Sequence, residues 1–192
     1  ARAALDKVLA LIRQSKRPII YAGGGIITAG APTQLRAFAD KTGIPVALTV
    51  HGLGAFPSKH YLCLQMLGMH GTIYANYAIN EADLLLAFGV RFDDRVTGKV
   101  SEFAKHGKIV HIDIDPSEIN KIKQATVPIC GCVGSALTEM LTMIKEDPKR
   151  IPPASQYADW MQQIDRWRDA EPMRFQDRDD AIVPQYAIQR LW

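Results

Sequence analysis

Apolar positions recur along the chain at two spacings, one typical of helices and one of strands, and the two alternate. Leu5, Val8, Leu9 and Ile12 lie three or four residues apart and predict an amphipathic helix over residues 2–15. Short runs rich in aliphatic and β-branched residues predict strands. The predicted strands cover residues 17–22, 44–49, 83–88, 109–115 and 126–130, and the further predicted helices cover 31–41, 71–81, 137–144, 155–169 and 184–192.

This alternation is typical of βαβ units, so we predict an α/β fold with a doubly wound parallel sheet and helices on both faces. The pattern changes after residue 144, because residues 145–153 are polar and rich in proline, as linkers are. We expect one domain over residues 1–147, a linker with one helix over 148–183, and the start of another domain over 184–192. We also expect the chain to be part of a longer protein.

The composition is that of an ordinary globular protein. Of the 192 residues, 47% are hydrophobic and 22% are charged, and the formal net charge is +3. So small and evenly spread a charge predicts neither a nucleic-acid partner nor a membrane partner, and no apolar run approaches the roughly 20 residues of a membrane span. Cys63, Cys130 and Cys132 make no disulfide framework, which favours a reducing compartment and a cytoplasmic location.

A dense polar cluster follows the predicted strand at 83–88. Arg91, Asp93, Asp94, Arg95 and Lys99 lie in one glycine-bracketed segment. Ligands of open α/β sheets bind at the carboxyl ends of the strands, so this segment is a candidate site. An arginine presents a planar fork to carboxylate or phosphate, and two arginines four residues apart can hold two anions, or one anion and an adjacent aspartate. A salt-bridged turn without a ligand is the alternative.

The glycine run at 23–25 is a second candidate. It follows a strand and precedes a helix, so its backbone could approach a phosphate closely. The dinucleotide fingerprint is incomplete, because Thr28 takes the place of the third glycine and no acidic residue ends the second strand. A nicotinamide site is thus poorly supported, while a nucleotide site of another geometry and a plain tight turn both stay open.

Three further places carry suitable side chains. Thr49 could meet a phosphate or ribose, or simply favour a strand. Met69 could cover an aromatic ring and His70 could donate or accept a hydrogen bond, although a lone histidine is more often an ordinary surface residue. Of Asp113 and Asp115, one is expected to reach a ribose or amide and the other to cap the next helix.

Metal binding and nucleophilic catalysis are not expected. Cys130 and Cys132 have no second cysteine pair, and the five histidines show no ligand spacing. Neither a serine nor a cysteine stands in a nucleophile-elbow pattern. The cysteines are more simply explained as residues at a strand end.

Several segments between Arg17 and Ile144 together resemble one family. The chain resembles the central domain of the acetohydroxyacid synthase (acetolactate synthase) catalytic subunit, a thiamine diphosphate and FAD enzyme of branched-chain amino-acid biosynthesis. The residues that carry the resemblance are Thr42–Val46, Leu67–Thr72, Tyr74–Ala78, Gly89–Lys99 and His111–Asp115, and Pro184–Tyr186 resembles the entry into the family's thiamine-pyrophosphate domain.

The resemblance implies a six-stranded sheet that holds FAD in a structural role, within a three-domain chain that forms homo-oligomers. The reaction implied is decarboxylation of pyruvate on thiamine diphosphate, followed by addition to a second 2-keto acid. The activating glutamate and the Gly-Asp-Gly motif that binds Mg²⁺ and pyrophosphate do not occur here, so we expect those functions in other domains and no activity from this chain alone. A regulatory subunit is a further candidate partner.

The family's site residues carry over to matching positions. Arg95 is expected to bind the substrate carboxylate and Asp94 to orient it, while Met69 and His70 line the same channel. The last FAD contact falls on Gly131-Cys132, where a cysteine replaces the family's aspartate. The expected FAD contacts are Gly24, Thr49, Val50, Leu67, Gly68, Met69, His70, Gly89, Val90, Arg91, Phe92, Asp93, Asp113, Ile114, Gly131 and Cys132.

Three alternatives stay open at this point. One is the central domain of another thiamine-dependent 2-keto acid decarboxylase that has lost the flavin, and the loops at 67–70 and 89–93 speak against it. The second is a non-catalytic nucleotide-binding or regulatory module. The third is an NAD-dependent deacylase, which would need paired Cys-x-x-Cys zinc ligands that this sequence lacks.

Overall fold

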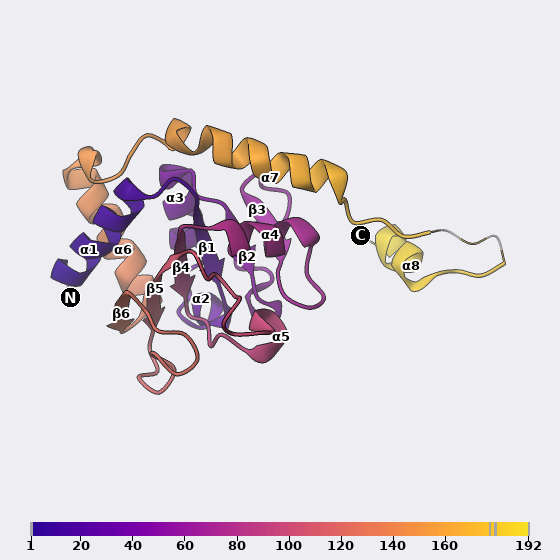
Figure 1. Ribbon diagram of the computed structural model, residues 1–192, viewed down its shortest axis with the longest axis horizontal. Coiled ribbons are helices and arrows are strands. Elements are labelled where there is room, and N and C mark those ends of the chain that lie inside the picture. The colour runs from indigo at the N-terminus through magenta and orange to yellow at the C-terminus, as the bar shows by residue number, and fades with distance from the viewer. Residues whose placement is uncertain (1, 177, 179, 192) are drawn as a thin grey trace.

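The computed structural model describes residues 2–176, 178 and 180–191 (Figure 1). Its centre is a six-stranded parallel sheet in the order β3-β2-β1-β4-β5-β6, which confirms the predicted doubly wound α/β fold. The order reverses between β1 and β4, and such a switch point is where open α/β sheets bind ligands. The strands are β1 Pro18–Ala22, β2 Val46–Leu48, β3 Cys63–Met66, β4 Leu84–Phe88, β5 Lys108–Asp113 and β6 Val127–Cys130.

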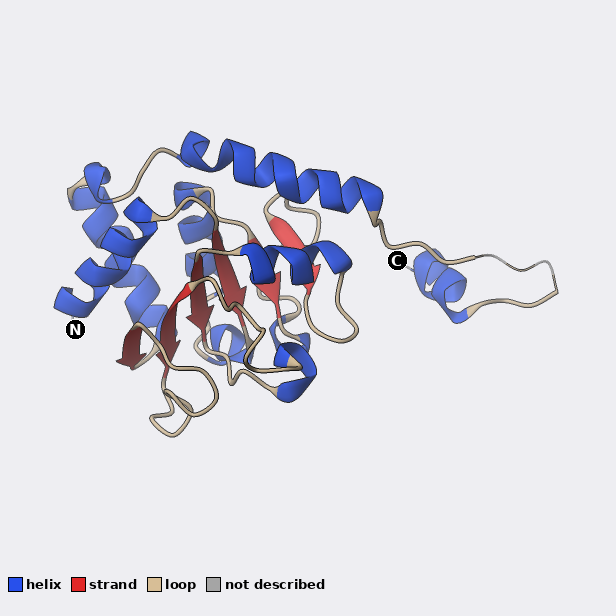
Figure 2. Ribbon diagram, in the orientation of Figure 1, coloured by secondary structure: helices blue, strands red, loops and turns tan. Residues whose placement is uncertain are grey.

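Helices surround the strands, as Figure 2 shows. The apolar stripe predicted for the first helix is confirmed, because Leu5, Val8, Leu9 and Ile12 are all buried. The α-helices are α1 Arg2–Gln14, α2 Gly24–Thr28, α3 Pro32–Thr42, α4 Ile73–Glu81, α5 Asp94–Thr97, α6 Val133–Glu146, α7 Ala158–Ala170 and α8 Pro184–Leu191, with short 3-10 turns η1 Val50–Gly52, η2 Pro148–Arg150 and η3 Ala154–Tyr157.

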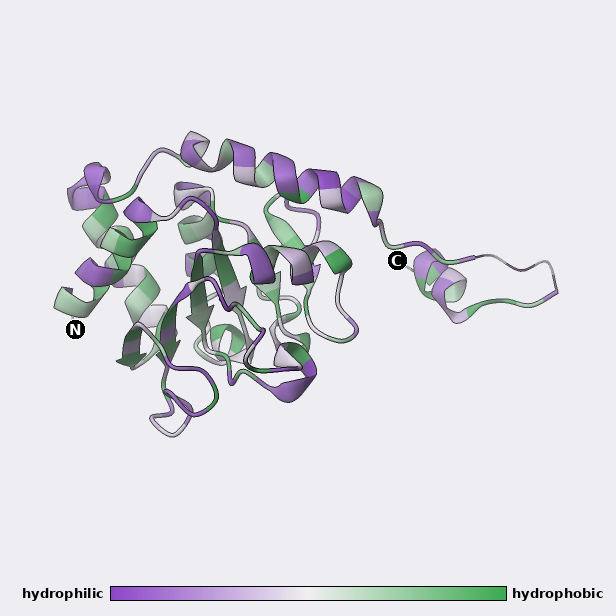
Figure 3. Cartoon of the chain, in the orientation of Figure 1, coloured by the Kyte–Doolittle hydropathy of each residue, from purple (hydrophilic) through white to green (hydrophobic). Residues whose placement is uncertain are grey.

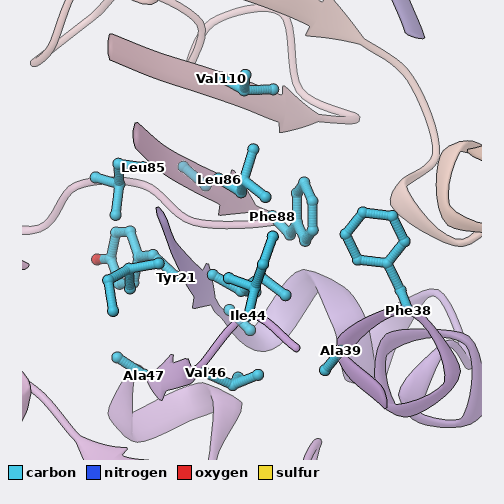
Figure 4. Close-up of a cluster of buried hydrophobic side chains, with 14 of the residues drawn as sticks. Tyr21, Phe38, Ala39, Ile44, Val46, Ala47, Leu85, Leu86, Phe88 and Val110 are labelled. Carbon is cyan, nitrogen blue, oxygen red and sulfur yellow. The ribbon is translucent and has the colours of Figure 1, made fainter. Parts of the chain in front are cut away.

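The core lies on both sides of the central strands. Every residue of β1 and of β4 is buried, as expected for strands covered by helices on two faces. Figure 4 shows part of this core, in which Tyr21 of β1 and Phe88 of β4 lie among aliphatic side chains and Phe38 of α3. Figure 3 shows the same division, with hydrophobic colour on the strands and hydrophilic colour along much of α7.

The structure differs from the predicted elements at several points. The strand pattern missed β3, a four-residue strand in which Gln65 has a φ of 63° and is half-buried. The strand predicted over 109–115 ends at Asp113, because its carboxylate accepts the backbone N–H of Asp115 and turns the chain away. The short helices α2 and α5 lie in segments predicted as a glycine turn and a polar loop.

Helix α7 packs against the sheet unit, which confirms that its aromatic stripe is a packing surface. The hydroxyl of Tyr157 donates to the Ile12 carbonyl (2.8 Å), and the indole N–H of Trp160 donates to the Pro18 carbonyl (3.1 Å). Ile164 is fully buried beside them. The domain boundary at residue 147 stays a prediction. Among the described residues, helices that combine the length and the apolarity of a membrane span do not occur.

Candidate functional site

A cavity of about 790 Å³ opens at the carboxyl ends of the strands, beside the switch point between β1 and β4. It receives residues that follow β1, β2, β4, β5 and β6, so segments distant in sequence meet there. A cavity of this size suits a small molecule or a cofactor. The predicted site residues that line it are Gly24, Thr49, Val50, Gly89, Val90, Arg91, Asp93, Arg95, Asp113, Ile114 and Cys132.

The other predicted site residues do not line this cavity. Leu67 and Phe92 are buried in the core, and Asp94, Met69 and His70 are exposed outside it. The remaining two, Gly68 and Gly131, also lie outside its lining.

The loop after β3 supports the cavity wall from behind. The backbone N–H of Met69 donates to the Arg95 carbonyl (2.9 Å). Gly68 has a φ of +95°, and a Cβ there would lie 2.7 Å from the same carbonyl, so the position requires glycine. The Asn76 side chain bonds both the N–H and the carbonyl of Gly68. The loop thus holds α5, which carries Arg95, in place.

Glycine residues, which have no side chain, form one side of the cavity. A Cβ on Gly23 would lie 2.2 Å from the Gly89 carbonyl oxygen, so β1 and β4 can end this close together only with glycine at that position. Gly24 lies against His51, whose Cβ would be 3.2 Å from an added Cβ. The side chain of Thr49 accepts the Gly52 N–H (3.0 Å), which leaves its hydroxyl proton for a ligand.

Basic side chains border the cavity beside this backbone. The side chain of Arg91 is 63% exposed, and its guanidinium lies 3.8 Å from the Asp93 carboxylate. Asp93 caps α5 by accepting the backbone N–H of Arg95 (3.1 Å), and this hydrogen bond is the main reason that its pKa is lowered. The guanidinium groups of Arg91 and Arg95 can donate hydrogen bonds to an anion at this end of the cavity, although Asp93 and the adjoining Asp94 offset their charge.

Acidic side chains border the cavity near the ends of β5. Asp113 is buried, and one of its oxygens accepts the Asp115 N–H (2.9 Å). Asp115 accepts both the N–H and the hydroxyl of Ser117, which lowers its pKa. Asp115 therefore caps a turn. The expectation that Asp113 or Asp115 caps a helix is wrong, because the residues that follow Asp115 form a turn and not a helix. Together with Glu118 these carboxylates suit the hydroxyl groups of a ribose.

Cys132 is the N-cap residue of α6 and lines the cavity. Its thiol makes no capping hydrogen bond in the folded chain, but the backbone N–H of Ser135, then the Ser135 hydroxyl and the Gly134 N–H, favour the thiolate and lower the pKa of the thiol. Cys130, two residues earlier, is exposed and lies 3.7 Å from the Ile114 carbonyl oxygen. Cys63 is buried in β3, and burial raises the pKa of its thiol.

Several residues of the lining carry no signal in the sequence. Tyr21 stands in an apolar strand, and His51 and Val133 follow no motif, so only the folded arrangement brings them here. Among the described residues, clusters of three or more histidine, cysteine, aspartate or glutamate side chains suited to a metal do not occur. Gly23, Gly25 and Asp115 also line the cavity, and they lie in segments that the sequence had indicated. The lining residues that the sequence had not indicated as ligand contacts are Tyr21, Thr28, Ala29, His51, Val96, Glu118 and Val133.

Comparisons with known proteins give matches along most of the chain. Residues 5–140 match the family model described as "Thiamine pyrophosphate enzyme, central domain". The chain is 50% identical to acetolactate synthase 1, chloroplastic, of Oryza sativa subsp. japonica, over 97% of this chain and 28% of that protein. It is 49% identical to acetolactate synthase 1, chloroplastic, of Zea mays (97% and 29%), and 46% identical to acetolactate synthase, chloroplastic, of Arabidopsis thaliana (97% and 27%).

The chain thus spans less than a third of the length of these relatives. The matched region contains all six strands and the whole lining of the cavity. The family model covers well over half of the chain. The chain therefore belongs to the thiamine pyrophosphate enzyme family, as a central domain of that family.

Proposed function

We propose that this chain is the FAD-binding central domain of an acetolactate synthase. Similarity to acetolactate synthases along almost the whole chain supports this assignment. The observation that carries the cofactor assignment is the cavity at the switch point, with arginine side chains on one side and the carboxylates of Asp113, Asp115 and Glu118 on another. Full-length enzymes of this kind would condense pyruvate with a second 2-keto acid, and thiamine diphosphate and Mg²⁺ would be held by other domains.

The residues present fit a flavin nucleotide. Arg91 offers a guanidinium to the diphosphate, and the side-chain-free backbone at Gly24 lets that group approach closely. Asp113 can accept hydrogen bonds from ribose hydroxyls. The apolar side chains of Val50 and Ile114 are 60% and 72% exposed, which leaves them free to cover an aromatic ring system. Bound FAD would supply structural support rather than redox chemistry.

Arg95 is the residue we propose for the substrate carboxylate. Its guanidinium stays charged at every physiological pH and offers a bidentate geometry to a 2-keto acid. Asp94, which begins the first turn of α5, is proposed to orient Arg95. The exposed Met69 and His70 lie on the loop that bonds the Arg95 backbone. These residues would bind and orient substrate, and the chemistry would need groups from other domains.

Contacts with other parts of a larger assembly are also proposed. Ile73 and Tyr77 on α4 are 44% and 46% exposed, and Met69 is 64% exposed. Such apolar exposure next to the proposed substrate channel suits burial against the other two domains or a second subunit. Assembly as a homo-oligomer, association with a regulatory subunit and a cytoplasmic location remain predictions.

A flavin fluorescence titration of the purified chain tests the proposal. We expect saturable quenching of FAD, weakened about tenfold by Arg91→Ala because one charge-assisted contact to the diphosphate is lost. Arg36→Ala is the matched control, since Arg36 is exposed on α3, pairs with Asp40 and does not line the cavity. Absence of quenching in this chain and in the longest protein that its gene encodes would contradict the proposal. Flavin binding without carboligase activity in that longest protein would favour the non-catalytic nucleotide-binding module.

A further inference from the structure

A buried histidine lies directly behind the cavity. His111 is fully buried in β5, where it pairs with Ala87 of β4 and Pro128 of β6. Its neighbours in the strand are Val110 and Ile112, so a polar ring is unusual at this place. His111 does not line the cavity, and the cofactor contacts proposed above make no use of it. A polar side chain in an apolar strand needs a partner, and the partner lies in the turn after β4.

One hydrogen bond joins His111 to that turn. Nε2 of His111 lies 2.8 Å from the carbonyl oxygen of Val90, which lines the cavity. A carbonyl only accepts, so Nε2 carries the proton and donates it. Nδ1 is buried without a partner, which fits the neutral ring with a single N–H. Burial lowers the pKa of His111, against the weaker opposite effects of the Val90 hydrogen bond and of Asp113 and Glu118, so the neutral donor is favoured.

A second contact joins the His111 ring to Phe92, a residue of the same turn whose backbone is strained. Phe92 has a φ of 53°, a left-handed conformation that is unfavourable for a bulky side chain. Its ring is buried and meets the ring of His111 edge-on, at a centroid distance of 5.0 Å and an interplanar angle of 90°. Tyr21 and Phe103 contact Phe92 from other sides. The strained backbone persists because this packing fixes the side chain.

We propose that His111 is a positioning residue for the flavin-binding turn at 89–93. One imidazole holds the Val90 carbonyl by a hydrogen bond and the Phe92 ring by packing, two residues apart. Arg91 lies between Val90 and Phe92 in the chain, and Asp93 directly follows Phe92. Asp93 in turn caps the helix that carries Arg95. His111 thereby sets where the cationic groups of the cavity lie without touching the ligand. The inference rests on the proposed function, in which this cavity holds FAD.

A matched pair of variants separates the hydrogen bond from packing. The amide nitrogen of glutamine stands close to the place of Nε2, so His111→Gln keeps a donor for Val90, whereas His111→Met fills space without one. The backbone amides of Gly89 and Val96 report on the two ends of the turn, because they donate to Ile112 (2.9 Å) and Asp93 (3.0 Å). The amide of Ile20, which donates to Pro45 (2.9 Å) in the centre of the sheet, reports on global stability.

Hydrogen exchange in the chain without ligand tests the inference first. In His111→Met we expect the Gly89 and Val96 amides to exchange about tenfold faster, as the loss of one buried hydrogen bond implies, while Ile20 is unchanged. In His111→Gln all three amides should exchange as in the wild type. A merely structural role would accelerate Ile20 as much as the turn, and that result, or fast exchange in both variants, would overturn the inference. Nitrogen-15 NMR should show the Nε2–H tautomer near neutral pH, and an Nδ1–H tautomer or an imidazolium would also overturn it.

FAD titration of the same variants then connects the turn to the cofactor. We expect His111→Met to weaken FAD binding about tenfold and His111→Gln to restore it to within about twofold of the wild type. Equal binding by wild type and His111→Met would overturn the link to the cofactor. If the wild type itself binds no FAD, the proposed function fails in this chain, whereas hydrogen exchange still decides whether His111 positions the turn.

Discussion

Gly25 and Gly89 lie back to back at the carboxyl ends of β1 and β4. A Cβ added to either glycine would lie 2.6 Å from the Cα of the other, and the Gly25 N–H donates to the Gly89 carbonyl (3.2 Å). Gly89 also has a φ of +60°, which disfavours other residues. Backbone contact between these two glycines therefore fixes the side of the cavity where β1 and β4 end.

Gly25→Ala should destabilise the fold by about 1–3 kcal/mol, because the added methyl group forces apart two backbones that have no room to move. The measurement is urea unfolding at neutral pH. Gly131→Ala is the matched control, since Gly131 lies at the same sheet edge with open space around an added Cβ. Equal unfolding free energies for the two variants would contradict the close contact.

Elements whose own apolar residues form a clear strand or helix pattern could be predicted from the sequence. β4 is a run of five buried apolar residues, Leu84–Phe88, and α1 repeats its apolar positions at helical spacing. β3 could not be predicted, because it is short, half-buried at Gln65 and Met66, and carries Gln65 at positive φ. It is a strand because β2 pairs with it, and that pairing is a tertiary contact.

The candidate site was predictable to a similar extent. Charged residues that follow buried strands, such as Arg91 and Asp113, indicated the sheet edge, and the structure brings them to one cavity. Leu67 was expected beside the cofactor but is buried at the start of the loop that supports α5. Which face of that loop meets the cavity depends on how α5 packs against it, and residue types alone do not determine that packing.

Asp93 should make part of the stability depend on pH. Its folded-state pKa is lowered below the ordinary 3.8, chiefly by the hydrogen bond from the Arg95 N–H, so its contribution is complete above the unfolded pKa and is lost as pH falls through the folded value. Asn caps helices as well as Asp does but has no charge to lose. Urea unfolding of wild type and Asp93→Asn should therefore show an advantage of the wild type that shrinks from pH 6 to pH 2, by less than about 1 kcal/mol for so exposed a group. An advantage that is constant over this range would contradict the assignment.

Cys132 should react readily with iodoacetamide, and FAD should protect it. Thiolate is the reactive form, so the rate rises with pH and levels off above the thiol pKa, and the lowered pKa moves this plateau to lower pH than in the urea-unfolded chain. Because Cys132 lines the cavity, FAD at about ten times its Kd should slow alkylation about tenfold. Mass spectrometry of the Cys132 peptide measures the rate.

Cys63 serves as the internal control in the same experiment. It is buried, and burial raises the pKa of its thiol, so it should stay unmodified until the chain unfolds, with or without FAD. Protection of both cysteines by FAD would indicate general stabilisation by the ligand rather than occupation of the cavity. An alkylation rate at Cys132 that FAD leaves unchanged would place the flavin elsewhere.

Substitution of Tyr157, which directly precedes α7, tests whether α7 and its N-terminal turn contribute to the stability of the fold. Tyr157→Phe keeps the ring but removes the shorter of two hydrogen bonds to the Ile12 carbonyl, which also accepts the Ser15 N–H (3.3 Å), so the free energy of unfolding should fall by about 0.5–1.5 kcal/mol. Tyr186→Phe on α8 is the control, since Tyr186 is 37% exposed and should change little. Truncation after Asp147 should be more destabilising than Tyr157→Phe, because Trp160 and Ile164 also leave the core. If residues 1–147 alone had the same free energy of unfolding as the whole chain, the boundary predicted at 147 would be confirmed and α7 would not be part of the folded domain.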